Sequence, residues 1–317
     1  MKKYAFLFPG QGAQTVGMIK DFCESYPEAR KIVDDVTKIT GVDMQKLLWE
    51  SEQNFLNRSD NSQLAITTAS VAVMKVLETK GIKPSAAMGF SLGEFPALYA
   101  AGVLSFEDVI NVVYKRGKIM QATCERIAAE NQGNPPGMTA VLGLPPEKVI
   151  ELANSIKDAY AANLNSSVQT VVSGTAQALI ELEAKAKEAG ARRALRLAVA
   201  GPFHSPLMQE AADNFEDAIS DVVFNNPKEI LFSNVTGNRV TDGNEIKKNA
   251  VLHLTNPVRW TDEENALAQI IKNDSENEWC LTEPGVGTVL AGLWAKTPYA
   301  EERKCISVNS VESLANL

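Results

Sequence analysis

Short apolar runs alternate with helical segments from the N-terminus to about residue 122, and this alternation restricts the possible fold more than any other feature. The run at 4–8 ends at Pro9 and Gly10, as expected for a buried strand that enters a loop. Helical segments and a second strand follow, in the order 18–37, 63–80, 84–89 (strand), 92–101 and 106–122. Strands that alternate with helices predict an α/β fold with a mainly parallel sheet.

The middle of the chain carries a different pattern. Strand and helix signals occur at 138–144, 145–155 (helix), 159–164, 169–173, 176–189 (helix) and 193–199. This βαββαβ order is the ferredoxin-like pattern. We therefore expect a small ferredoxin-like subdomain at 135–198, inserted into a large α/β domain made of 1–134 and 199–317. The strand-like runs 230–235, 279–281 and 305–308 would return to the main sheet.

Composition argues against several classes of protein. The net charge of -8 over 317 residues is unfavourable for a nucleic-acid binder, which normally carries a basic face. The four cysteines are scattered, which predicts neither a zinc site nor a disulfide framework. Pro9 ends the first apolar run too early for a secretory signal, and no run approaches the roughly 20 apolar residues that span a bilayer. We expect a cytoplasmic protein with no membrane or nucleic-acid partner.

The sharpest local signal is Gly-Phe-Ser-Leu-Gly at 89–93, between a predicted strand and a predicted helix. In that context a G-x-S-x-G sequence forms a tight turn that lifts the serine hydroxyl clear of the backbone. The following helix N-terminus directs free N–H groups toward developing negative charge. Ser91 is therefore a candidate nucleophile, although a serine that only caps the helix would fit the same position.

A serine nucleophile needs a base, and the chain contains only two histidines. His204 lies in a loop bracketed by Pro202 and Pro206, which can hold an imidazole rigidly. His253 is the second candidate. The loop at 9–14 contains two glycines but lacks the Lys-Ser/Thr of a phosphate-binding motif. A backbone N–H of this loop could instead join that of Leu92 in an oxyanion hole.

Five motifs occur in a recognisable order: PGQGAQ at 9–14, GFSLGE at 89–94, RGKIMQ at 116–121, GPFHS at 201–205 and NPVRW at 256–260. With these motifs the sequence resembles the malonyl-CoA:acyl carrier protein transacylase family, which includes the acyltransferase domains of fatty-acid and polyketide synthases. The resemblance covers nearly the whole chain. It implies a hydrolase-like large domain with an inserted ferredoxin-like subdomain.

The resemblance also implies roles for individual residues. It makes Ser91 the nucleophile and His204 the general base, and it assigns the oxyanion-hole amides to Gln11 and Leu92. Arg116 would bind the free carboxylate of a malonyl group, which suits a planar guanidinium that can donate two parallel hydrogen bonds. The remaining roles implied are acyl selection by Phe203, which would crowd an α-methyl branch, and orientation of the base by the backbone carbonyl of His253.

Three positions depart from the family pattern. Phe90 stands where the family usually has His, and it changes the surroundings of the serine. Because Phe90 is not the proposed base, the serine–histidine mechanism is unaffected. Pro96 lies early in the helix after the turn, where proline is tolerated only within about the first turn. His253 replaces a Gln whose carbonyl orients the base in the family, and any residue retains that carbonyl.

The resulting prediction is an S-malonyltransferase of fatty-acid biosynthesis that needs no cofactor. It would move a malonyl group from malonyl-CoA to the phosphopantetheine thiol of acyl carrier protein by ping-pong kinetics. The alternatives are a serine thioesterase or acyl hydrolase, a standalone acyltransferase of a polyketide pathway, and a non-catalytic docking protein. A hydrolase would normally carry an acidic triad member between serine and histidine, and no Asp or Glu there stands out.

Overall fold

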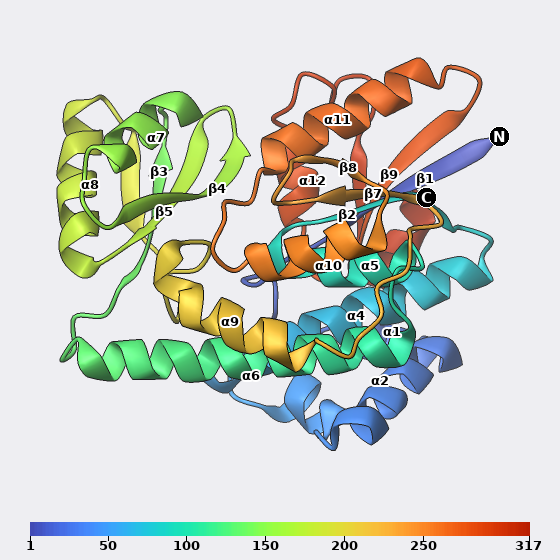
Figure 1. The fold of residues 1–317 in the computed structure, drawn as a ribbon. Coiled ribbons are helices and arrows are strands. Elements are labelled where there is room, and N and C mark those ends of the chain that lie inside the picture. The colour runs from blue at the N-terminus through green and yellow to red at the C-terminus, as the bar shows by residue number, and fades with distance from the viewer.

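The computed structural model describes residues 1–317 and contains two separate sheets (Figure 1). In the larger, six-stranded sheet every neighbouring pair is parallel except β7 and β8. The strands, from one edge to the other, are β10 (Cys305–Val308), β9 (Glu278–Pro284), β1 (Lys2–Phe8), β2 (Pro84–Gly89), β7 (Ile230–Ser233) and β8 (Asn238–Val240). The predicted α/β fold with a mainly parallel sheet is confirmed.

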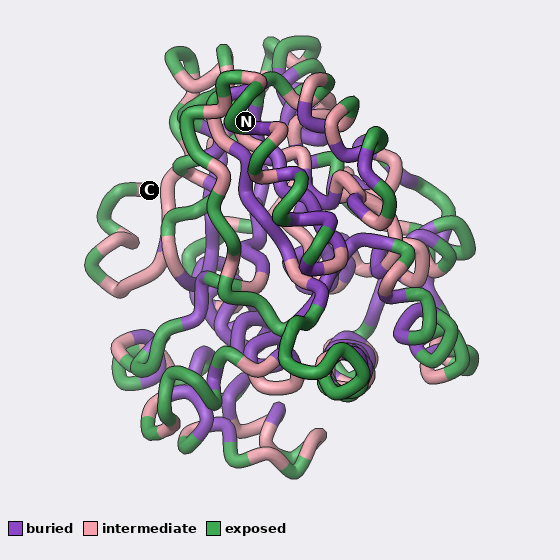
Figure 2. Tube along the Cα trace, turned by 90° about the vertical axis from the view of Figure 1, so that its left-hand side faces the viewer, coloured by how far each residue is buried: buried purple, intermediate pink, exposed green.

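Helices cover both faces of this sheet, which is why its central strands are continuously apolar. Successive side chains of a strand point to opposite faces. Accordingly, Phe6 and Phe8 of β1 join one apolar cluster, whereas Ala5 and Leu7 join another. The buried residues run through the middle of the molecule in Figure 2.

The first cluster is formed with helices α1 (Lys20–Ser25), α2 (Pro27–Thr40), α3 (Gln53–Leu56), α4 (Ser59–Thr79), α5 (Glu94–Ala100), α6 (Phe106–Glu130), α9 (Gln209–Ala218) and α10 (Gly243–Leu252). The second is formed with α11 (Trp260–Asn273) and α12 (Val289–Trp294). Short single turns lie at Lys46–Glu50, Ser91–Gly93, Pro206–Met208 and Glu312–Asn316. No helix combines the length and the apolar character needed to cross a membrane.

The smaller sheet is antiparallel and has the strand order β4-β5-β3-β6. Its elements follow the predicted βαββαβ sequence: β3 (Gly137–Leu142), α7 (Pro146–Asn154), β4 (Ala159–Ser166), β5 (Gln169–Gly174), α8 (Ala176–Glu188) and β6 (Arg193–Arg196). Its two helices pack on one face around an apolar cluster of their own. This unit lies to one side of the main sheet, beyond the end of α6 (Figure 1).

Several boundaries differ from the sequence prediction. The predicted helix at 18–37 is two helices, because Pro27 starts a new one. The predicted strand at 193–199 pairs only as far as Arg196. The short strand β8 was not predicted, since three residues carry too little periodicity to be noticed.

Candidate active site

The turn that carries Ser91 joins β2 to α5 and depends on close backbone packing. Ser91 has a φ of 52°, in the left-handed region that side chains other than glycine rarely adopt. A Cβ on Gly93 would lie 2.0 Å from the carbonyl oxygen of Phe8, so only glycine lets the turn lie against the end of β1. Pro96 falls in the first turn of α5, where its missing N–H removes no helical hydrogen bond.

Three groups from distant parts of the chain form a hydrogen-bonded line at this turn. The hydroxyl oxygen of Ser91 lies 2.8 Å from Nε2 of His204. On the other side of the ring, Nδ1 of His204 lies 2.8 Å from the main-chain carbonyl oxygen of His253. A carbonyl can only accept, so Nδ1 carries the proton and Nε2 is free to accept the hydroxyl proton of Ser91. The imidazole is thus poised as a base.

Burial tunes this imidazole. His204 is 4% exposed, and burial together with the positive charge of Arg116 lowers its pKa from 6.5 to about 4. The ring is therefore neutral near pH 7 and able to take a proton. The second histidine makes no hydrogen bond to Ser91: its ring lies beside that of His204, tilted by 40° with centroids 4.9 Å apart, and neither of its ring nitrogens has a partner.

The loop after β1 lies beside the serine turn. The N–H of Phe90 donates to the carbonyl of Phe8 at 3.0 Å, which fixes the start of this loop against the turn. Gln11 lines the same cavity as Ser91, and its Nε2 donates to Ser62 Oγ at 3.0 Å. Leu92 is fully buried directly behind the serine. Gln11 and Leu92 thus follow the ends of the neighbouring strands β1 and β2, Leu92 directly after the serine in sequence.

Arg116 is a buried cation with unused hydrogen-bonding capacity. It is 1% exposed, its Cζ lies 5.1 Å from the centre of the Phe95 ring, and its Nη1 donates to Gln63 Oε1 at 2.7 Å. Its Nε and Nη2 have no partner. Burial lowers its pKa to about 10, so it stays charged at neutral pH. Each unpaired buried donor costs about 1–3 kcal/mol, so a carboxylate is the natural missing partner.

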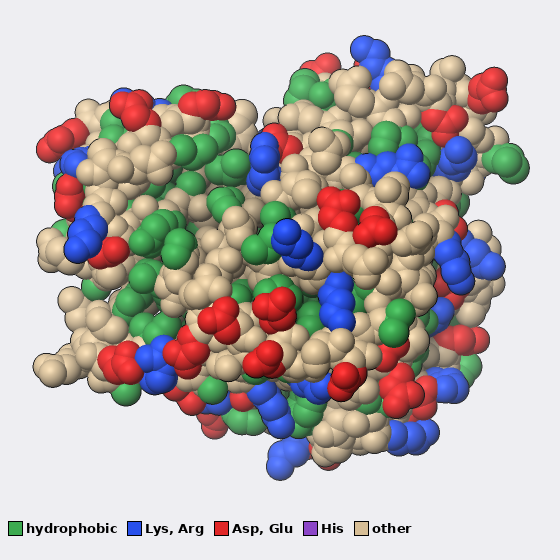
Figure 3. All heavy atoms as spheres, viewed as in Figure 1, with side chains coloured by type: hydrophobic (Ala, Val, Ile, Leu, Met, Phe, Trp, Pro, Cys, Tyr) green, Lys and Arg blue, Asp and Glu red, His purple; other side chains and the backbone are tan.

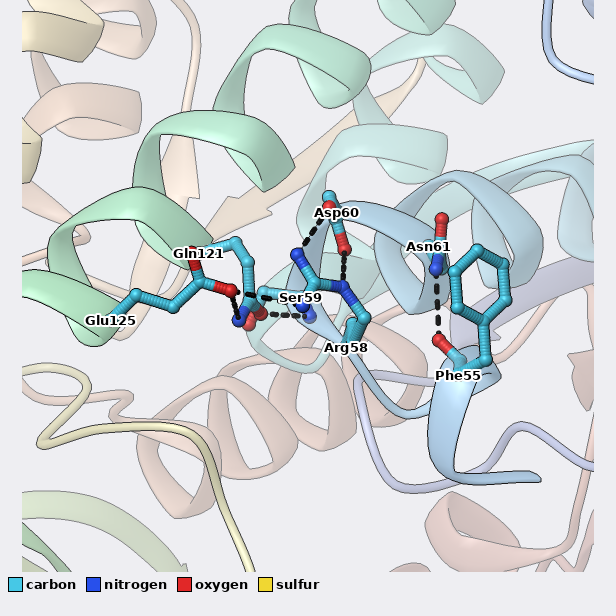
Figure 4. A network of polar contacts seen from close by, with 7 residues as sticks. All are labelled: Phe55, Arg58, Ser59, Asp60, Asn61, Gln121 and Glu125. Carbon is cyan, nitrogen blue, oxygen red and sulfur yellow. Dashed lines mark hydrogen bonds and ion pairs between the residues drawn. The ribbon is translucent and has the colours of Figure 1, made fainter. Parts of the chain in front are cut away.

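A polar network joins the start of α4 to α6 (Figure 4). The guanidinium of Arg58 bonds the carboxylate of Asp60 and reaches Glu125 on α6 at 2.9 Å. The side chain of Gln121 accepts from the N–H of Ser59 at 2.9 Å.

The two helices also touch directly beside Arg116. A Cβ on Gly117 would lie 2.9 Å from the carbonyl oxygen of Ser59, so glycine allows the close approach.

A cavity of about 510 Å³ lies beside Ser91 and His204. Gln11, Ser91 and His204 line its main-sheet side, and Met120, one helical turn after Arg116, lines its floor. Its opposite wall comes from the strands of the small sheet and the segment that leaves it. These residues are Met138, Ala140, Asn163, Asn165, Gln169, Val171, Leu197, Ala198, Val199 and Ala200. The rest of the lining is Gly12, Gln14, Gln53, Asn57, Ser59, Phe90 and Phe203. Arg116, Leu92 and His253 lie behind this surface.

Two residues of the site were missed by sequence reasoning. Gln63 links Arg116 to Gln11, since its Nε2 donates to Gln11 Oε1 at 3.2 Å. Asn234 follows β7 and accepts a hydrogen bond from the N–H of Ser91 at 2.7 Å. Neither lies in a motif, so no local signal marked them. Phe90, the noted departure, packs edge-on against Trp260 with centroids 5.5 Å apart and lines the cavity.

A serine hydroxyl bonded to a neutral imidazole at a strand-to-helix turn is the arrangement of an enzyme that forms an acyl-serine. Comparison with known families sharpens this class, because residues 5–274 match the model described as acyl transferase domain. The chain belongs to the acyl transferase family.

The relatives cover nearly the whole chain. A malonyl CoA-acyl carrier protein transacylase of Haemophilus influenzae is 37% identical, over 99% of this chain and 97% of the relative. The protein of the same name from Bacillus subtilis is 35% identical, over 99% and 96%.

Solved structures agree. A malonyl CoA-acyl carrier protein transacylase from Clostridium perfringens has a TM-score of 0.89 at 32% identity, covering 99% of this chain and 95% of that chain. A malonyl-transacylase in complex with its type II polyketide synthase acyl-carrier protein has a TM-score of 0.88 at 31% identity, covering 99% and 98%.

Proposed function

We propose that this chain transfers a malonyl group from malonyl-CoA to the phosphopantetheine thiol of acyl carrier protein, through an acyl-enzyme on Ser91. The observation that carries the proposal is the pairing of two features. Ser91 Oγ lies 2.8 Å from a neutral imidazole, and the buried guanidinium of Arg116 has two unpaired nitrogens. The first feature suits acyl transfer and the second suits an acyl group with a free carboxylate. The names of the relatives point to the same reaction.

In the first half-reaction, His204 takes the proton of Ser91 as the oxygen attacks the thioester carbonyl. The negative charge that develops on the carbonyl oxygen would be stabilised by the N–H groups of Gln11 and Leu92. When the tetrahedral intermediate collapses, the C–S bond breaks. The imidazolium of His204 protonates the departing CoA thiolate.

The second half-reaction reverses these steps. His204 takes the proton of the pantetheine thiol, the sulfur attacks the acyl-serine, and the C–O bond to Ser91 breaks. The imidazolium returns its proton to the serine oxygen. The carbonyl of His253 holds the ring in the same tautomer throughout. These steps move only protons and one acyl group, so the chemistry requires no cofactor.

Acyl selection would come from two side chains. Arg116 pairs with the free carboxylate of the malonyl group in place of its missing partners. Phe203, 8% exposed, brings an aromatic ring to the cavity that holds the serine. A branch at the α-carbon would crowd this ring, so we expect malonyl to be preferred over methylmalonyl.

The inserted unit proposed at 135–198 would form the small-sheet wall of the cavity, and the segment that leaves it would guide the pantetheine arm toward Ser91.

Acidic and basic side chains are interspersed over the face seen in Figure 3, without a large area of one sign. All four cysteines are free.

The rival reaction, hydrolysis, differs only in its acceptor. A carbonyl rather than a carboxylate supports the imidazole, unlike the usual hydrolase triad. The test is to incubate the protein with labelled malonyl-CoA and a carrier protein that bears its phosphopantetheine arm. We expect the label on the carrier protein, at a rate well above the release of free malonate. Release of malonate at an equal or higher rate would contradict the proposal.

A further inference from the structure

Asn234 makes hydrogen bonds to three residues of the serine turn: Gly89 before the nucleophile, Ser91 itself and Glu94 after it. It follows β7 and is fully buried. Its Nδ2 donates to the carbonyl of Gly89 at 2.7 Å, and its Oδ1 accepts from the N–H of Ser91 at 2.7 Å. Its own backbone N–H donates to Glu94 Oε2 at 2.8 Å. One residue from another strand therefore holds both ends of the turn.

We infer that Asn234 is a positioning residue for acyl transfer: its side-chain amide holds Ser91 in the left-handed conformation that directs Oγ to His204. This inference rests on the proposed function and adds a residue that no motif identified.

The physical reason lies in the turn itself. A serine at a φ of 52° is in a sparsely populated conformation that persists only where the surroundings impose it. Asparagine offers an acceptor and two donors in one rigid plane, and here the acceptor meets an N–H while the donors meet oxygens. The opposite orientation of the amide would set donor against donor, so a single orientation satisfies every contact.

Two buried acids bind Asn234, one at its side-chain amide and one at its backbone. The second donor of Nδ2 reaches Glu263 Oε1 on α11 at 2.7 Å, and the backbone N–H is held by Glu94 on α5. Glu94 in turn faces the charge of Arg116. Burial raises the pKa of Glu94 to about 7. Burial, with the nearby charges of Glu94 and then Glu264, raises the pKa of Glu263 well above its usual range. A neutral amide between them adds no further charge.

The direct test removes the amide and measures the reactivity of Ser91. Asn234→Ala should lower the rate of labelling by a small fluorophosphonate about 100-fold, because a misplaced nucleophile loses its alignment with the base. The kcat for malonyl transfer should fall by the same factor, with KM for malonyl-CoA near the wild-type value. The matched control is Asn249→Ala on α10, an asparagine that is also buried but whose Nδ2 has no partner. It should label at the wild-type rate.

A second variant separates positioning from general loss of stability. In Asn234→Asp the carboxylate can accept from the N–H of Ser91 but cannot donate to Gly89. Protonation restores a donor, so its labelling rate relative to wild type should rise as the pH falls from 8 to 6. Glu94 and Glu263 bind position 234 directly, Glu264 acts on Glu263, and the fixed charge of Arg116 acts on Glu94.

The outcomes are distinct. Wild-type labelling of Asn234→Ala, or a pH-independent ratio for Asn234→Asp, would overturn the inference. Slow labelling of Asn234→Ala beside a normal Asn249→Ala would support it. Fluorophosphonate labelling needs no malonyl group. A wild-type protein that labels but forms no malonyl adduct would therefore contradict the proposed function, and the labelling ratios would still decide the inference.

Discussion

The two sheets meet the same cavity with different kinds of residue. The carboxyl ends of the main-sheet strands bring Gln11, Ser91 and Asn234, each tied by hydrogen bonds to another buried or half-buried group. The small sheet contributes strand-face side chains such as Ala140 and Asn163, and on the same strand as Asn163, Asn165 leaves its Oδ1 without a partner. The main-sheet residues are fixed by hydrogen bonds, whereas the small-sheet wall keeps a polar atom free.

This difference predicts which side of the cavity determines the rate of transfer and which side determines the affinity for the substrate. Chemistry needs atoms held in one geometry, which the cross-linked main-sheet loops provide. The small-sheet wall needs only a complementary shape and a few free polar groups to bind the long, flexible pantetheine arm. Substitutions on the main-sheet side should therefore lower kcat, whereas those on the small sheet should raise KM.

The largest loss is expected for His204→Ala. Without the base, Ser91 keeps its proton at the moment of attack, and kcat should fall by at least about 10⁴-fold. His253→Gln is the matched control, because it removes the other imidazole but keeps the carbonyl that accepts from Nδ1. It should retain most of the activity in a steady-state transfer assay. Equal losses in both variants would contradict the assignment of the base.

Arg116→Ala should weaken malonyl transfer selectively. Loss of one member of a buried ion pair lowers kcat/KM by about 10²- to 10³-fold. Transfer from acetyl-CoA, which has no free carboxylate, should not fall. Lys115→Ala, a neighbouring exposed cation on α6 that bonds the carbonyl of Ala218, serves as the control. A parallel loss with both CoA esters would show that Arg116 does not read the carboxylate.

Phe203→Ala should change preference more than rate. With the ring removed, the ratio of methylmalonyl to malonyl transfer should rise about tenfold, the usual effect of one methyl group in a pocket. The measurement is direct competition between the two CoA esters. Phe224→Ala, buried to a similar extent away from the cavity, should leave the ratio unchanged.

The smallest effect is expected on the small sheet. Asn163→Ala should raise KM for malonyl-CoA about fivefold, the effect of losing one hydrogen bond to the substrate, with kcat unchanged. Asn154→Ala on α7 is a control on the same unit, outside the cavity lining. A fall in kcat with a constant KM would erase the distinction between the two sheets.

The sequence predicted those parts of the site that are encoded locally. The apolar run of β2 followed by Gly89, Ser91 and Gly93 is a continuous stretch, so strand, turn and nucleophile could be read together. The contact between Ser91 and Asn234 spans 143 positions, and Asn234 looks like any turn residue after a short strand. Such contacts are set by the order of strands in the sheet, which single-sequence patterns do not specify.

The roles implied by the family motifs were likewise limited to residues that stand in a motif. Arg116 was assigned its role because it stands in a motif, whereas Gln63, which accepts a hydrogen bond from it, lies within an ordinary buried helix. The strand β6 ended earlier than its apolar pattern suggested. The segment from Leu197 to Ala200 leaves the sheet to line the cavity, so its apolar character serves the pocket.

The most direct measurement is the intact mass of the protein after a brief incubation with malonyl-CoA alone. A gain of one malonyl group on the wild-type chain, mapped by peptide sequencing to position 91 and absent in Ser91→Ala, is the predicted result. An unmodified wild-type protein, or an adduct that persists in Ser91→Ala, would contradict a malonyl-serine intermediate.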